Sequence, residues 1–271
     1  MSVPATVSGL SKTIQSFPSH TITHREDMVA GRSASMPSVF PHFPHLYMTD
    51  EKLHRLLDRT AQFHTEVQRH VQSLLSAPDE RFVAAFQSGL LSLEHALSTL
   101  MLVDQGLFSS AIALTRPQFE SLVRGVWLLH AASDSWVAKL SEPLTMETAK
   151  RANEGLGLAD MLNELEAHPD APAPIVAQLR EYKEVTWKAM NSYAHGGLHP
   201  LSRTMTGYPP QLIYDVIRNS NAVVALTAQL QSILSGVAEN MQPVREMHEH
   251  FADVLPIIHS TAASTRGKHV G

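Results

Sequence analysis

FSSAIALTRPQFESLVRGVWLLHAAS, residues 108–133, carries apolar side chains on nearly every side of a helix. A helix that is apolar all round is buried in the protein interior, so this segment is predicted to be the central element of the fold. Pro117 lies inside it and lacks a backbone N–H, which predicts a kink or a stacked helix start at that point.

The segments on both sides repeat their apolar residues at three-and-four spacing, the period of an amphipathic helix. The expected helical ranges are 53–75, 82–100, 136–140, 146–167, 175–193 and 213–237, with a short piece continuing to about 258. A loop is predicted around Pro200, Gly207, Pro209 and Pro210. No run alternates with the period of a β-strand, so the predicted fold is all-α, a bundle of about six to eight helices.

Residues 1–47 are rich in Ser, Thr, Pro and His and have no sustained apolar period, which predicts a disordered N-terminal extension. A single helical-bundle domain is predicted over residues 48–258, followed by a flexible tail over 259–271. Met48 and the residues after it look like an ordinary protein start. The hypothesis that translation begins there is tested by sequencing the native N-terminus.

The composition excludes several classes of function. A net charge of −5 and a pI near 6.3 leave no global basic surface for non-specific DNA binding, so any nucleic-acid contact has to be local. The absence of cysteine excludes disulfides, thiolate catalysis and the usual structural zinc sites, and a reducing, cytoplasmic location is expected. No phosphate loop, dinucleotide fingerprint or nucleophile elbow is present, so no cofactor is predicted.

The most apolar stretch, residues 89–114, is interrupted by Glu94, His95 and Asp104. A lipid-facing helix tolerates such residues poorly, so a membrane span is not expected. The stretch is better explained as a buried helix pair joined by a turn at Asp104-Gln-Gly106.

Three charged residues lie on the central helix at i, i+4 and i+8: Arg116, Glu120 and Arg124. They share one face and can pair along it. A charge in apolar surroundings is costly unless it is paired, so such a ladder is either kept for function or serves as a structural network that orients neighbouring helices.

Asn191 and His195 lie four residues apart near the end of the 175–193 helix, with Trp187 one turn earlier. Their amide and imidazole can face the same cleft, where His195 has a suitable pKa range for a general acid or base. The alternative is capping alone, because Gly196 is a natural residue to end a helix and a histidine in the last turn interacts favourably with the helix dipole.

The Asn-x-x-x-His end of this helix resembles the motif of the HEPN superfamily, which includes many RNases of toxin-antitoxin and phage-defence systems. The resemblance implies an all-α dimer in which an arginine and a histidine cleave RNA without a metal. Met190 stands where that family has the motif arginine. The phosphate-binding cation would then have to be Arg116, Arg124 or Arg203.

A second resemblance rests on the segment Thr115-Arg-Pro-Gln-Phe-Glu120 and on Trp127, together with the downstream Met190-Asn-x-x-x-His-Gly. These motifs are similar to those of uncharacterised bacterial helical proteins, some of them linked to abortive infection. The similarity covers roughly residues 50–240.

Other histidines make weaker candidates. His195 and His199 are separated by two glycines that break the helix, and no further ligands with metal spacing accompany them. His248 and His250 lie in a charged segment that is expected to be a solvated face. No metal site is predicted.

Two hypotheses therefore stand. In the first, a dimeric HEPN-like defence or toxin-type protein binds RNA or a nucleotide at a cleft that joins the Asn191–His195 motif to the charged ladder. In the second, the protein is a non-catalytic helical module that binds a partner or ligand, and its Arg/Glu network is structural. A separation above about 10 Å between His195 and every member of the ladder would remove the first hypothesis.

Overall fold

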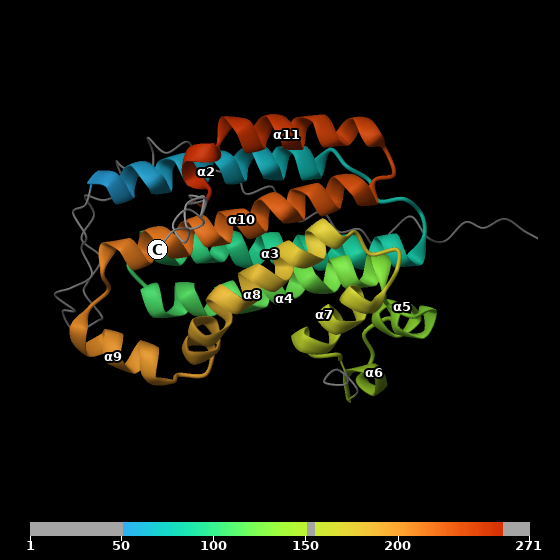
Figure 1. Ribbon diagram of the computed structural model, residues 1–271, viewed down its shortest axis with the longest axis horizontal. Coiled ribbons are helices and arrows are strands. Elements are labelled where there is room, and N and C mark those ends of the chain that lie inside the picture. The colour runs from blue at the N-terminus through green and yellow to red at the C-terminus, as the bar shows by residue number, and fades with distance from the viewer. Residues whose placement is uncertain (1–50, 151–154, 257–271) are drawn as a thin grey trace, which may run out of the picture. The chain divides into compact units, whose positions relative to one another are not determined.

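The computed structural model describes residues 51–150 and 155–256 (Figure 1). The predicted extension 1–47, the tail 259–271 and the domain boundaries at 48 and 258 lie outside these ranges. Within them all regular secondary structure is helical, with no strand, as predicted. The number of helices was underestimated, because residues 51–150 and 155–256 alone contain ten α-helices rather than six to eight.

The α-helices are α2 (Glu51–Gln72), α3 (Glu80–Asp104), α4 (Phe108–His130), α5 (Asp134–Ser141), α6 (Met146–Lys150), α7 (Leu158–Ala167), α8 (Ala173–Ala194), α9 (Leu198–Thr206), α10 (Pro210–Leu234) and α11 (Met241–His250). Two 3₁₀ turns follow α10 and α11, η2 (Ala238–Asn240) and η3 (Ala252–Val254). The predicted loop after His195 was wrong, since it contains α9. Pro200 is the third residue of α9, in the first turn, where the missing N–H costs no hydrogen bond.

Helix α4 is the centre of the bundle, as its sequence predicts. It packs against α3, α7, α8 and α10, and Phe119, Leu122 and Trp127 are fully buried at its core-facing positions. The helix runs through Pro117 without a break, so a new helix start does not occur there. The predicted pairing of α3 with α4 is confirmed, and the turn between them contains Gly106 at a φ of 73°, a conformation that favours glycine.

The second long buried helix, α10, carries an unusual set of polar residues in the core. These residues are each at most 2% exposed: Ser220, Asn221, Thr227, Gln231 and Ser232. Their side chains bond to other helices, since the Ser220 hydroxyl donates to Gln118 Oε1 (2.8 Å) and the Gln231 amide donates to Phe86 O (2.9 Å). Buried polar groups without partners are costly, so these bonds fix how α10 packs.

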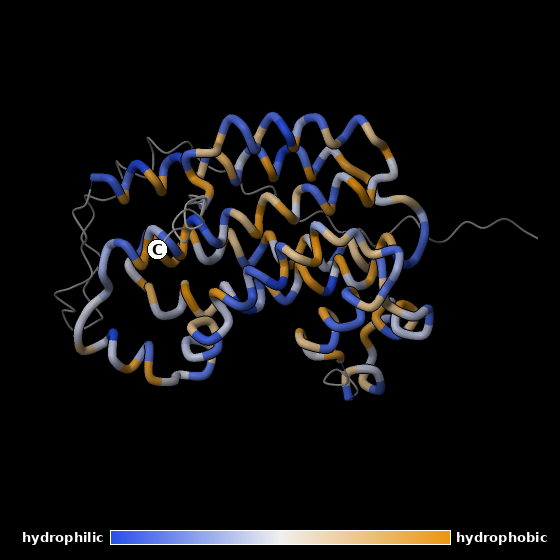
Figure 2. Tube along the Cα trace, in the orientation of Figure 1, coloured by the Kyte–Doolittle hydropathy of each residue, from blue (hydrophilic) through white to orange (hydrophobic). Residues whose placement is uncertain are grey.

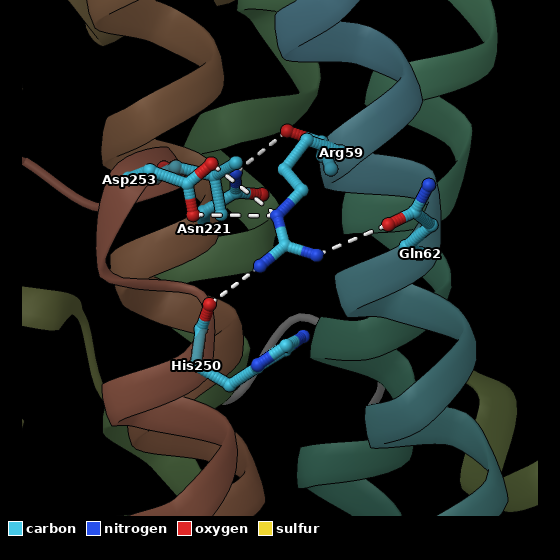
Figure 3. Close-up of polar contacts among 7 residues, drawn as sticks. Arg59, Gln62, Asn221, His250 and Asp253 are labelled. Carbon is cyan, nitrogen blue, oxygen red and sulfur yellow. Dashed lines mark hydrogen bonds and ion pairs between the residues drawn. The ribbon is translucent and has the colours of Figure 1, made fainter.

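Helices α2 and α11 lie side by side, and hydrophilic and hydrophobic residues alternate along both (Figure 2). Arg59 on α2 joins them: its guanidinium donates to His250 O (2.5 Å) and Gln62 Oε1 (3.1 Å) and pairs with Asp253 (3.3 Å) (Figure 3). The same guanidinium lies 4.3 Å from the centre of the Phe251 ring. The C-terminal end of α11 is thereby held on α2.

None of the helices within the described ranges combines the length and the apolar content that a membrane span requires.

Candidate functional site

Helices α4 and α8 bring together one arginine, one glutamate, one tryptophan and one histidine. The Arg116 guanidinium donates from Nε to Glu120 Oε1 (3.0 Å), one turn along α4. Its Nη1 donates to His195 Nε2 at the end of α8. The guanidinium carbon also lies 5.0 Å from the centre of the Trp187 ring, also on α8. Arg116 is therefore the centre of the site, and the separation that would have removed the first hypothesis is not observed.

The contact with Arg116 sets the hydrogen-bonding role of His195. A guanidinium carries only donors, so His195 Nε2 is the acceptor in this contact. The His195 side chain is exposed, so the ring is open to solvent.

The end of α8 explains why His195 lies where it does. His195 is the C-cap of α8, and its backbone N–H donates to Asn191 O (3.1 Å). Gly196 follows with a φ of 64°, and Gly197 N donates to Ser192 O (2.7 Å), which closes the helix end. The predicted capping role of this segment is thus present together with the contact to Arg116.

Two of the predicted site residues do not join this cluster. Arg124 forms no ion pair or hydrogen bond with any residue that the structure describes, so the predicted ladder reduces to the pair Arg116–Glu120. Asn191 is half-buried, and its side-chain Oδ1 has no hydrogen-bond partner in the described part of the chain. Asn191 and His195 are linked through the backbone, since His195 N donates to Asn191 O (3.1 Å).

A second group of residues lies nearby on α8 and α9 and in the loop after α9. Burial raises the pKa of the Tyr193 hydroxyl, with a further contribution from Tyr208, while Arg203 acts in the opposite direction. The His199 ring lies 6.1 Å from the Tyr193 ring, and Tyr208 hydrogen-bonds to a serine at the start of α4. Arg203 was predicted only as a substitute cation, and its tyrosine neighbours were not predicted.

The charge around the site differs from that of the whole chain. No Asp or Glu occurs from residue 185 to residue 214, a segment that holds Lys188, His195, His199 and Arg203, although the protein has a net charge of −5. The sequence itself carries this signal, since the absence of acids is a property of the segment alone. The segment forms the C-terminal half of α8, α9 and the start of α10, and so gives the site a locally basic flank.

The arrangement supports anion binding rather than metal binding. Over the described ranges, no group of three or more His, Asp or Glu side chains is placed to hold a metal ion. Two cavities, one between α2 and α3 and one between α2 and α11, have linings that do not include Arg116 or His195. In the site on α4 and α8, His195 is exposed, whereas Arg116, Glu120 and Trp187 are half-buried.

Comparison with protein families gives one match. The model of a family of unknown function, DUF6988, matches residues 89–257. This range begins inside α3 and includes α4, α8 and all the residues of the site. No curated protein and no solved structure matches the chain. Because the match covers more than half of its length, the chain belongs to the DUF6988 family.

Proposed function

We propose that the Arg116–His195 surface binds a phosphate of single-stranded RNA and that His195 transfers a proton in cleavage of the RNA chain. The observation that carries the proposal is the hydrogen bond from Arg116 to His195 Nε2. It places a permanent cation beside an imidazole nitrogen that accepts a hydrogen bond, and two such groups can stabilise developing charge and transfer a proton without a metal. The resemblance to HEPN RNases, a cytoplasmic location and a role in phage defence belong to the same proposal.

Arg116 is suited to hold the phosphate. Glu120 binds Nε and His195 binds Nη1, which leaves donors on both terminal nitrogens for phosphate oxygens. Trp187 lies against the guanidinium and restricts its orientation, so less freedom is lost when a phosphate binds. The acid-free segment 185–214 adds attraction for a polyanion.

His195 is suited to act as the base. When a phosphate oxygen takes over the Nη1 donor of Arg116, the lone pair of Nε2 becomes available to accept the proton of a ribose 2′-hydroxyl. The 2′-oxygen then forms a bond to phosphorus, the bond from phosphorus to the 5′-oxygen breaks, and the leaving 5′-oxygen takes a proton from water. The hydroxide that remains removes the proton from His195 Nε2, which restores the free imidazole and the water. Arg116 offsets the negative charge that develops on the phosphate oxygens.

The test compares wild type with His195→Gln and Arg116→Gln on end-labelled single-stranded RNA without divalent metal. Cleavage by wild type and a loss of at least about a hundredfold in both variants are expected from the usual contribution of one acid-base or charge-stabilising group. His248→Gln, on the exposed face of α11, serves as the matched control and should cleave like wild type. Equal cleavage by all four proteins, or cleavage by none, contradicts the proposal.

A specific observation favours the second candidate, a non-catalytic module with a structural Arg/Glu network. Two partners of Arg116, Trp187 and His195, lie on α8, so the cluster also fastens the end of α8 to α4. In that case Arg116→Gln lowers the thermal stability, and no RNA substrate is cleaved by any of the proteins.

A further inference from the structure

Helix α9 exposes an apolar stripe that no part of its own bundle covers within the described residues. Leu198, Leu201 and Met205 are 80%, 63% and 84% exposed and lie at i, i+3 and i+7, on one side of the helix. Pro200 faces the opposite way and is buried, and α9 packs against α8. In Figure 1, α9 is at the lower left of the view, away from the pair α2 and α11.

A groove that can receive such a stripe lies between α2 and α3. It has a volume of about 300 Å³ and apolar walls that include Val67 and Val71 on α2 and Leu90 and Leu97 on α3. Leu90 and Leu97 are also more than 40% exposed, so the apolar surface continues from the groove onto the outer face of α3. Glu94 lies between them at the groove.

The α3 wall of the groove and α9 are complementary in charge. No Lys or Arg occurs from residue 82 to residue 115, which covers nearly all of α3, whereas Glu94 and Asp104 do occur there. The segment 185–214, which contains α9, has no Asp or Glu. Two α3 faces paired across a two-fold axis at the groove would instead bring two copies of Glu94 together, which repel each other.

The two surfaces also match in spacing. Leu198 and Met205 are seven residues apart, as are Leu90 and Leu97, and seven residues span about 10.5 Å along any α-helix. Anchors at i, i+3 and i+7 are the pattern by which an amphipathic helix fills an apolar groove. We propose that α9 of one copy of this chain docks in the α2–α3 groove of a second copy.

This association is head-to-tail, and it goes beyond the proposed function because it involves neither Arg116 nor His195. Each contact uses two different surfaces, so a pair of molecules keeps one free α9 and one free groove, and further copies can add. A nine-residue helix buries little area, so the contact is weak and depends on protein concentration.

The test is sedimentation velocity from low to high micromolar concentration on wild type, Leu201→Glu and Leu97→Glu. Wild type should gain mass with concentration, and each variant alone should stay monomeric, with association weakened at least about tenfold by a buried carboxylate. An equimolar mixture of the two variants should form a pair that does not grow, because each supplies the surface that the other lacks. Leu144→Glu, at an 85% exposed position between α5 and α6 and outside both surfaces, is the matched control and should behave like wild type.

Circular dichroism melting confirms that each variant is folded before it is compared. The proposal is overturned if wild type is monomeric throughout, which leaves both surfaces to other partners. It is also overturned if only one variant loses association, or if the mixture remains monomeric, since both results indicate pairing of like surfaces. Monomeric wild type that binds phosphatidylglycerol vesicles, where Leu201→Glu does not, assigns the stripe on α9 to a lipid surface instead.

Discussion

Replacing His64 with glutamine tests how this bundle responds to acid. His64 lies on α2 with Nε2 3.0 Å from Asn221 Oδ1, and the Asn221 amide nitrogen donates to Thr60 Oγ1 (3.0 Å) and Val254 O (3.1 Å). The network around Asn221 lies between α2, α10 and η3 (Figure 3). A carbonyl oxygen only accepts, so the amide nitrogen of Asn221 has to face Val254. Its Oδ1 therefore faces His64, which donates as a neutral imidazole.

The expected loss in the free energy of unfolding at acid pH follows from the pKa of His64. Burial lowers it from 6.5 to about 4, while the bond to Asn221 acts in the opposite direction. Between pH 4 and pH 6.5, His64 is protonated in the unfolded chain but not in the folded protein. The contribution of His64 to the free energy of unfolding is therefore complete above about pH 6.5 and is lost as the pH falls. By linkage, the loss is about 2 kcal/mol at pH 5 and about 3 kcal/mol at pH 4.

The assay is urea unfolding of wild type and His64→Gln at several values between pH 7 and pH 4. Glutamine can still donate to Asn221 but does not titrate, so each protein is compared with its own value at pH 7. From pH 7 to pH 5 the free energy of unfolding of the variant should fall by about 2 kcal/mol less than that of wild type. Parallel pH profiles for the two proteins would refute the assignment of this acid sensitivity to His64.

Two further substitutions test the packing around α3. Arg81→Met removes two charged hydrogen bonds of 2.7 Å to carbonyl oxygens at the end of α4, and a loss of about 2–3 kcal/mol in urea unfolding is expected. Arg55→Met on the exposed face of α2 is its control, with less than about 0.5 kcal/mol expected. Gly89→Ala places a Cβ 2.3 Å from Nε2 of Gln231, so a lower melting temperature and a cost of about 1–2 kcal/mol are expected despite the better helix propensity of alanine. Gly155→Ala, where nothing lies within 4 Å of the added Cβ, should leave the free energy of unfolding within about 0.5 kcal/mol of wild type.

The sequence predicts the position of a helix in the fold where the residue pattern of that helix alone determines it. Helix α4 is apolar on nearly every side, and such a pattern has no stable position except the interior. Helix α9 was missed because its apolar residues are exposed, so they are not part of the core pattern, and because Pro200 normally indicates a loop. Its place in the first turn of α9 makes it compatible with a helix.

The site was predictable in part for a similar reason. Arg116 and Glu120 are four residues apart on one helix, and this spacing alone favours their ion pair. Arg124 has the same spacing from Glu120, but that carboxylate already accepts from Arg116. The contact between Arg116 and His195 depends on how α8 crosses α4, and no local rule connects residues 79 positions apart. The two motifs were identified separately, and their contact is a result of the tertiary fold.

The buried polar residues of α10 also affect how many ways the bundle can be assembled. An apolar helix can slide by one turn, about 5.4 Å, and still bury nearly the same area. The hydrogen bonds of Ser220, Asn221 and Gln231 each specify one height along the helix axis, and a slip would leave all of them unpaired at once. The polar side chains therefore fix the position of α10 along its own axis. They exclude arrangements in which α10 is shifted by a turn, which hydrophobic burial alone would not distinguish from the native one.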